Sequence, residues 1–347
     1  MKNKFLIQII GVISMFLSAG NMYGQSSGFA VAKVFHIASA GGWDYIAVGP
    51  GNNRLYVSHS AQVNILDQTT GDSVGVIPNA TGVHGIAFVP SLNKGYTSNG
   101  RLNNVSVFDL KTNAVLSQIA AGTNPDAIMY DEYSKRIITC NGQSNDLTLI
   151  DPVTEKITAT IRVGGKPETA VSDGNGKIYV NIEDKNEIIA INLKTASIVK
   201  RWSVAPAEGP TGLAIDLKKN RLFAGCDGKL VILDIASGKI STVGIGNGCD
   251  GVAFDAALGY TFASCGEGKL SIVKEMSPGV YALVENVKTK SSARTIALDE
   301  QTHTVYLPAA DMGKAVPGQR APMIAGSFQI LVVKQKNNQE ATKSIVK

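Results

Sequence analysis

The stretch IAVGPGNNRLYV, residues 46–57, specifies the fold, because it joins a short apolar strand, a turn rich in Gly and Asn, and a second strand ending in Tyr-Val. The same pattern recurs as IAFVPSLNKGYT (86–97), IMYDEYSKRIIT (128–139), AVSDGNGKIYV (170–180), LAIDLKKNRLFA (213–224), VAFDAALGYTFA (252–263) and IALDEQTHTVYL (296–307). Successive copies begin 39 to 44 residues apart, a period that suits one four-stranded propeller blade. The sequence therefore predicts an all-β chain folded as a seven-bladed β-propeller of four-stranded blades.

The other strands of each unit follow in order. Third strands end on a carboxylate or amide before a turn, at Asp67, Asp109, Asp151, Asn192 and Asp234. Because such side chains accept downstream backbone N–H groups, we expect them to be structural and not catalytic. Fourth strands such as KITATIRV (156–163) alternate apolar and polar residues, which is typical of a half-solvated outer strand. The innermost strands are continuous apolar runs, so we expect both of their faces to be buried.

The seventh unit lacks a fourth strand at its own end of the chain. Its third strand is expected in SFQILVV (327–333), and only a polar tail, residues 336–347, follows. The stretch AVAKVFHIA (30–38) precedes the first inner strand and can complete the last blade, which leaves no exposed edge. We therefore predict one propeller domain over residues 29–335, with its last blade closed by the N-terminal strand.

Residues 1–24 have the features of a cleaved signal peptide. Lys2 and Lys4 precede an apolar stretch at residues 5–17, and small residues follow it. That stretch is too short to span a bilayer comfortably, and no basic cluster comes after it. We expect a bacterial protein that is periplasmic or secreted, has no membrane span after signal cleavage, and is a monomer.

The charge balance disfavours nucleic acid as a partner. The chain has 33 Lys and Arg against 28 Asp and Glu, and signal cleavage removes two of the bases. Some of the remaining excess lies in the tail, at Lys343 and Lys347. Nucleic-acid binding needs a basic footprint that this nearly neutral body lacks. A small molecule or a protein is the expected partner.

Several motifs resemble those of the YVTN-repeat, YncE-like β-propellers of bacterial export compartments. They are LYVS (55–58), IYVN (178–181), the Asp-x-x-Thr turns, and Gly-x-x-Pro at residues 122–125 and 164–167. The resemblance covers all seven units and implies the propeller fold. It implies single-stranded DNA binding for only some members. The sixth unit departs from the pattern, with Lys274-Glu275 in place of the Asp turn.

A ring of polar residues is predicted at one end of the propeller axis. The residues two positions before each inner-strand anchor are Asp44, His84, Asp126, Glu168, Thr211, Asp250 and Arg294. Blade symmetry brings equivalent positions around one axis, although these residues are distant in sequence. One interpretation is that strand starts are polar because they are solvated or cap loop backbone. The other is that the ring binds a ligand.

The ligand-binding interpretation has a cationic version. Crowded carboxylates raise one another's pKa and favour a bound cation or a shared proton. A divalent cation would be held by Asp44, His84, Asp126 and Asp250. No other cofactor is expected. Our first hypothesis is thus an exported, non-enzymatic binding or interaction propeller that uses this loop face.

The alternative is an enzyme. Seven-bladed lactonases look broadly similar and use a pore histidine, an acid and an arginine without a metal. That resemblance implies a metal-independent lactonase-type hydrolase with catalytic residues His84, Glu168 and Arg294. His84 would be the general acid or base, and Arg294 would stabilise an oxyanion.

Two further features belong to the predicted ligand face. Trp43 precedes Asp44 and could stack on a ligand or cap the core. Residues 308–326 form a long insertion in the seventh unit that carries Arg320. Loops of this length inside compact domains are usually functional or disordered. We expect the insertion to be a lid over the ring or a rigid flap.

Four cysteines, Cys140, Cys226, Cys249 and Cys265, are expected on the same face. An oxidising compartment and an even count favour a disulfide, and we predict one bridge among Cys226, Cys249 and Cys265. Zinc is disfavoured because the chain has no Cys-x-x-Cys pair. Cys140 is expected to be a buried small apolar residue.

Overall fold

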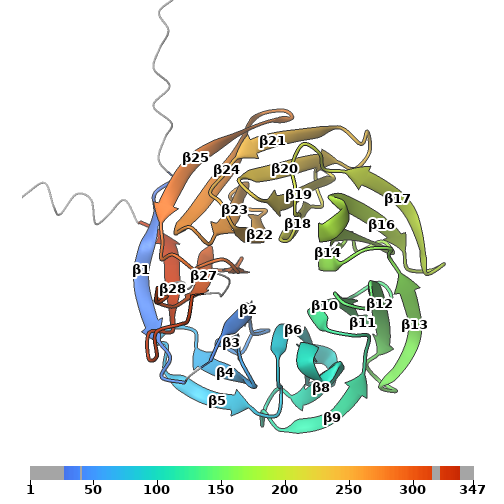
Figure 1. Ribbon diagram of the computed structural model, residues 1–347, viewed down its shortest axis with the longest axis vertical. Helices are drawn as coiled ribbons and strands as arrows, with labels where there is room; N and C mark the ends of the chain where they lie inside the picture. Colours follow the sequence, from blue (N-terminus) through green and yellow to red (C-terminus); the bar gives the residue numbers. More distant parts are fainter. Residues whose placement is uncertain (1–26, 40, 315–320, 337–347) are drawn as a thin grey trace, which may run out of the picture.

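Residues 27–39, 41–314 and 321–336 are described by a computed structural model, in which seven four-stranded sheets surround one axis (Figure 1). The predicted seven-bladed, all-β propeller is confirmed. The expected signal peptide and the tail beyond Lys336 lie outside the described residues. Within the described ranges, no helix is long and apolar enough to cross a membrane.

In each blade the first strand lies next to the axis and the fourth strand lies at the outer edge. Blade 1 contains β2 (Trp43–Val48), β3 (Arg54–His59), β4 (Gln62–Asp67) and β5 (Ser73–Ile77). Blade 2 contains β6 (Val83–Val89), β7 (Lys94–Asn99), β8 (Asn104–Asp109) and β9 (Val115–Ala120). Blade 3 contains β10 (Pro125–Asp131), β11 (Arg136–Asn141), β12 (Asp146–Asp151) and β13 (Lys156–Arg162). Blade 4 contains β14 (Pro167–Ser172), β15 (Lys177–Ile182), β16 (Glu187–Asn192) and β17 (Ser197–Ser203).

The remaining blades follow the same order. Blade 5 contains β18 (Leu213–Asp216), β19 (Arg221–Cys226), β20 (Lys229–Asp234) and β21 (Ile240–Gly244). Blade 6 contains β22 (Cys249–Asp255), β23 (Tyr260–Cys265), β24 (Lys269–Ser277) and β25 (Val280–Lys288). Blade 7 contains β26 (Ala297–Asp299), β27 (Thr304–Ala309), β28 (Gln329–Gln335) and β1 (Phe29–His36). Three short 3-10 helices lie in loops: η1 (Pro90–Leu92), η2 (Gly100–Leu102) and η3 (Glu183–Lys185).

The N-terminal strand closes the last blade, as predicted. β1 pairs antiparallel with β28, in a register that runs from Phe29 opposite Gln335 to His36 opposite Gln329. The Phe29 ring packs edge-on against Phe262 of blade 6, with ring centroids 5.1 Å apart. Figure 1 shows the first and last strands side by side at the ring seam. Closure therefore covers the free edge of β28 and adds apolar packing between blades.

The inner strands are less buried than expected in some blades, although β6 and β18 are mostly buried. The second and third strands are the most buried, as in β11 and β12, whereas the inner strand β10 is only half-buried. The outer strand β13 is mostly exposed, as predicted. The inner strands line the axis, so one side of each lacks a covering sheet. The middle strands are enclosed between neighbouring blades on both faces.

The turn carboxylates are structural, as expected. Asp67 Oδ1 accepts the backbone N–H groups of Thr69 and Thr70, each at 2.8 Å. Asp109 accepts those of Lys111 and Thr112 in the same way, at 2.9 and 2.8 Å. Hydrogen bonding to the charged form lowers the pKa of both carboxyls. In blade 6 the third and fourth strands lengthen to nine residues each, and the Glu275 carboxylate accepts the Gly279 N–H instead.

The insertion of blade 7 begins later than predicted, because Pro308 and Ala309 are still part of β27. Beyond it, Met312 and Met323 form an isolated antiparallel bridge. Met323 packs against the core between blades 7 and 1. Residues 315–320, which include Arg320, lie outside the described residues. The lid remains a prediction.

Candidate functional site

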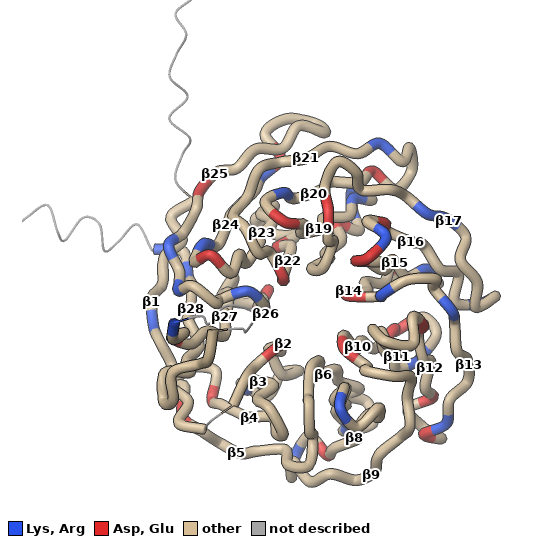
Figure 2. Tube along the Cα trace, viewed as in Figure 1, with Lys and Arg blue, Asp and Glu red and all other residues tan. Residues whose placement is uncertain are grey.

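The ring residues are positioned by irregularities at the start of the inner strands. In blades 1 to 4 the pairing of the first two strands shifts register next to the ring position, between Trp43 and Ile46 in blade 1 for example. In blade 6 the shift lies between Cys249 and Gly251. A bulge of this kind turns a side chain away from the regular pleat. Figure 2 shows the resulting acidic positions on β2, β10, β14 and β22 around the axis.

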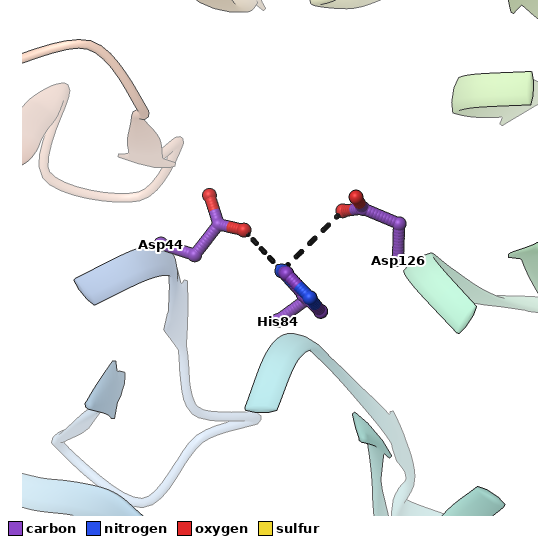
Figure 3. A group of neighbouring side chains, drawn as sticks. All are labelled: Asp44, His84 and Asp126. Carbon is purple, nitrogen blue, oxygen red and sulfur yellow. Dashed lines mark hydrogen bonds and ion pairs between the residues drawn. The ribbon is translucent and has the colours of Figure 1, made fainter. Parts of the chain in front are cut away.

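Three of the ring residues form a compact group. His84 Nδ1 lies 2.5 Å from Asp44 Oδ2 and 3.8 Å from Asp126 Oδ1 (Figure 3). One ligand atom from each of the three residues lies within 4.8 Å of the other two. The side chains come from adjacent inner strands, β2, β6 and β10. One nitrogen and two carboxylates thus converge at a spacing that a single cation could bridge.

Loop backbone packs closely against the other side of the His84 ring. A Cβ placed on Gly100, the first residue of η2, would lie 2.6 Å from His84 Nε2. The same Cβ would lie 2.7 Å from Asn124 Oδ1. Only glycine fits there without displacing the imidazole, so the loop holds His84 with Nδ1 toward the carboxylates.

The positive charges of the ring are already paired. The Arg294 guanidinium forms an ion pair with Asp250, and its Nη2 lies 3.6 Å from Asp44 Oδ1. Lys166 Nζ lies 2.7 Å from Glu168 Oε1 and also pairs with Glu183. Both cations are therefore held by carboxylates, and Asp126 has no partner of fixed charge within ion-pair distance among the described residues.

Three of the ring carboxyls, those of Asp126, Glu168 and Asp250, have shifted pKa values. Burial raises the pKa of Asp126 to about 6, although the His84 charge opposes the shift. Burial and the nearby Asp126 charge raise the pKa of Glu168, against the opposing effect of its ion pair with Lys166. Burial likewise raises the pKa of Asp250. Asp126 has a raised pKa and no partner of fixed charge among the described residues, so a bound cation would stabilise its ionised form.

The same surroundings favour the protonated form of His84 as well. Burial lowers its pKa, but the hydrogen bond to Asp44 and the charge of Asp126 outweigh that effect, so the pKa is raised. A proton on Nδ1 therefore occupies the position that a bound cation would take.

Tyr45 belongs to the site but was not among the residues predicted from the sequence. Burial and the charges of Asp126 and Asp44 raise the pKa of its hydroxyl well above the usual value. A comparison of the repeats could have found it. The residue after each ring position is Tyr45, Gly85, Ala127, Thr169, Gly212, Gly251 or Thr295, which is small in every blade except the first. Lys166 was also missed, because its position has no counterpart in the ring pattern.

The remaining predicted ring-face residues have structural contacts. Trp43 stacks on Phe328 with ring centroids 5.2 Å apart, and its indole nitrogen is buried without a hydrogen-bond partner among the described residues. Thr211 Oγ1 donates a 2.7 Å hydrogen bond to the Cys249 carbonyl. In the described part of the chain, no hydrogen bond or ion pair joins His84, Glu168 and Arg294 to one another. The trio of the hydrolase alternative is thus not assembled by direct contacts.

All four cysteines are described, buried and free. Cys249 and Cys265 lie directly opposite one another as cross-strand partners of β22 and β23. Contact with Cys249 lowers the pKa of the Cys265 thiol despite burial, whereas the same contact raises that of Cys249. The structure contains no bridge, and among the predicted candidates it brings this pair into register.

Comparisons with known proteins support the fold. No protein-family model matches the chain, and no curated protein matches it. Among solved structures, a chain of hydrazine synthase from Kuenenia stuttgartiensis is similar, with a TM-score of 0.70 and 15% identity. The match covers 84% of this chain and 98% of the other. At that identity the likeness concerns the propeller fold alone.

Proposed function

We propose that this protein is a binding propeller that holds a positively charged ligand at the ring face, between Asp44, His84 and Asp126. The observation that carries the proposal is the convergence of these three side chains within 4.8 Å. The raised pKa of Asp126 supports it, because the nearest fixed cations are committed to other carboxylates. A cation at this point would relieve repulsion among the acids.

The proposal includes the setting expected from the sequence. An exported, monomeric protein of the YVTN-repeat, YncE-like kind would meet ligands in the periplasm or outside the cell. Small molecules and other proteins remain the expected partners, and the ring lacks the basic surface that nucleic acid requires. A divalent metal is the simplest cation, and it would be held by Asp44, His84 and Asp126, because Asp250 is paired with Arg294.

Titration calorimetry tests the proposal with defined probes. We expect Mn²⁺, Ca²⁺, Zn²⁺ or methylammonium to bind, and Asp126→Asn to weaken the binding of the same probe at least about tenfold. Asp72→Asn is the matched control, because it removes an exposed carboxylate in the turn between β4 and β5. Failure of all four probes to bind, or equal losses in the two variants, would rule the proposal out.

One observation favours the hydrolase as a second candidate. The His84–Asp44 hydrogen bond resembles a general base that is oriented by a carboxylate. Against it, Arg294 is engaged by two acids and Glu168 by Lys166. A lactone-hydrolysis screen with wild type, His84→Ala and Arg294→Ala decides the matter. Activity that both substitutions leave unchanged would remove this candidate.

A further inference from the structure

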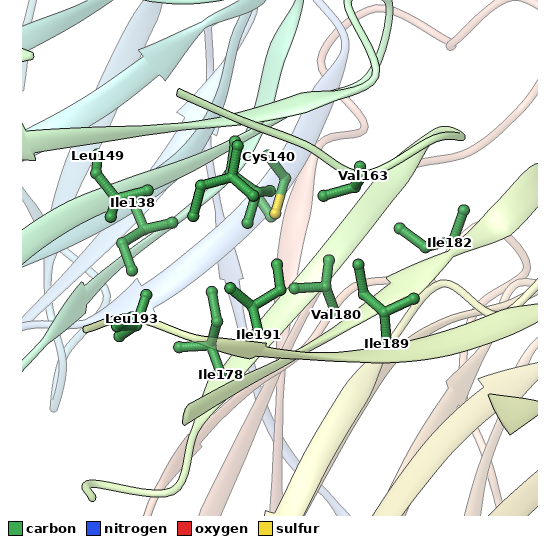
Figure 4. Close-up of a cluster of buried hydrophobic side chains, with 13 residues drawn as sticks. Ile138, Cys140, Leu149, Val163, Ile178, Val180, Ile182, Ile189, Ile191 and Leu193 are labelled. Atoms are coloured by element: carbon green, nitrogen blue, oxygen red, sulfur yellow. The ribbon is translucent and has the colours of Figure 1, made fainter. Parts of the chain in front are cut away.

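The Tyr45 side chain extends from blade 1 to the far side of the axis. Tyr45 follows the ring residue Asp44 on β2, yet it packs against the apolar core between blades 3 and 4. Figure 4 shows that core, with Cys140 among its isoleucines and valines. The other six blades have small residues at the equivalent position. Tyr45 is therefore the one bulky side chain at this position among the seven blades.

An apolar cavity adjoins this ring. Its volume is about 160 Å³, and its lining includes Tyr45, Ile86, Ile128, Met129, Ile138 and Ala170. Gly85, Ala127 and Thr169 also line it, and each immediately follows a ring residue. The cavity is consequently lined by the inner-strand residues next in sequence to the ring residues, although no ring carboxylate lines it. A cavity of about 150 Å³ with an apolar lining can hold a molecule the size of benzene.

Cys140 links the cavity to the acids. Its thiol is buried, lines the cavity, and makes no hydrogen bond within the described residues. Burial raises the pKa of this thiol, and the charges of Glu168 and Asp126 raise it further. Cys140 thus lies in the cavity wall and within the electrostatic influence of two ring carboxylates.

We propose that the ligand is a small organic cation, an ammonium group attached to an apolar group about the size of a benzene ring. The ammonium would lie between Asp44 and Asp126, and the apolar group would enter the cavity beside Tyr45. This inference rests on the proposed function and names its ligand class. A bare metal ion would satisfy the carboxylates and leave the cavity unused. The Tyr45 ring adds an aromatic wall against which the apolar group can pack.

Calorimetry with benzylamine, methylamine and benzyl alcohol tests the ligand class. We expect benzylamine to bind at least about tenfold more tightly than methylamine, because the ring leaves water for the cavity. Benzyl alcohol should bind more weakly than benzylamine, since it lacks the charge. Asp126→Asn should weaken both amines.

Filling the cavity separates this inference from the proposed function. Ala170→Leu should reduce benzylamine binding to the level of methylamine and leave methylamine binding unchanged. Ala159→Leu is the matched control, because Ala159 packs on the same core from the outer strand β13 and does not line the cavity. Tyr45→Phe should retain benzylamine binding, and Tyr45→Leu should weaken it.

The outcomes distinguish the two claims. If methylamine or a metal binds in an Asp126-dependent way while benzylamine gains nothing, the cavity inference is overturned and cation binding stands. If Ala170→Leu and Ala159→Leu lose benzylamine binding equally, the inference is also overturned. If no cation binds, both claims fail.

Discussion

His84 and Asp44 are joined by a hydrogen bond of 2.5 Å between imidazole Nδ1 and a carboxylate oxygen, although they lie 40 residues apart in the chain. The bond connects adjacent blades at the axis and directs Nδ1 into the ring. Because Asp126 approaches the same nitrogen, a proton and a bound cation compete for one position.

Cation binding should tighten as the pH rises. Protonated His84 repels a cation, and protonated Asp126 provides no charge. The pKa of His84 is raised above its usual 6.5, and that of Asp126 to about 6. Calorimetry of the probe that binds should therefore give at least about a tenfold gain in affinity between roughly pH 5 and pH 8. Affinity that is constant over this range would contradict the assigned site.

The Asp126→Asn variant should be more stable than wild type at alkaline pH without ligand. The folded-state pKa of Asp126 is raised from 3.8 to about 6. Its contribution to stability is thus full below about pH 4 and is lost as the pH rises through 6. Urea unfolding at about pH 8 should show a gain of up to about 3 kcal/mol, which should vanish near pH 3.5. A gain of equal size at both pH values would show that charge is not its cause.

Gly100→Ala should weaken cation binding with little effect on folding. The new Cβ would lie 2.6 Å from His84 Nε2, so the imidazole must shift at its free end. We expect about a tenfold loss of affinity and a change below about 1 kcal/mol in unfolding free energy. Gly142→Ala is the control, because its Cβ would meet nothing closer than 3.5 Å. Similar affinities in the two variants would argue against the role given to His84.

Mild oxidation should join Cys249 to Cys265. The two are cross-strand partners, and the lowered pKa of Cys265 makes it the more readily ionised thiol. With glutathione disulfide as oxidant, peptide mass spectrometry should find this bridge and leave Cys226 free. The bridge should raise the free energy of unfolding by about 2–3 kcal/mol. A bridge that includes Cys226, or none at all, would refute the pairing.

The repeat made most of the architecture predictable. Seven similar strand pairs set the number of blades, and the missing fourth strand of the last unit identified β1 as its partner. Burial was predicted correctly for the inner strands β6 and β18, which are mostly buried. It was predicted wrongly for β10, because sequence apolarity does not show that one side of this strand faces the axis.

The site was predictable to a smaller extent. Aligned repeats located Asp44, His84 and Asp126, because symmetry brings equivalent positions together. The pairing of Arg294 with Asp250, and of Lys166 with Glu168, depends on side-chain conformations that no repeat pattern encodes. Tyr45 was visible as the bulky exception in a series of small residues, but its packing across the axis required the structure.

The most direct test of the central claim is crystallographic. Crystals soaked separately with Mn²⁺ and with benzylamine should show at least one of the two between Asp44 and Asp126, in contact with both carboxylates. A manganese ion would give an anomalous peak there, and benzylamine would extend toward Tyr45. Well-ordered ring side chains with neither ligand between them would contradict the account.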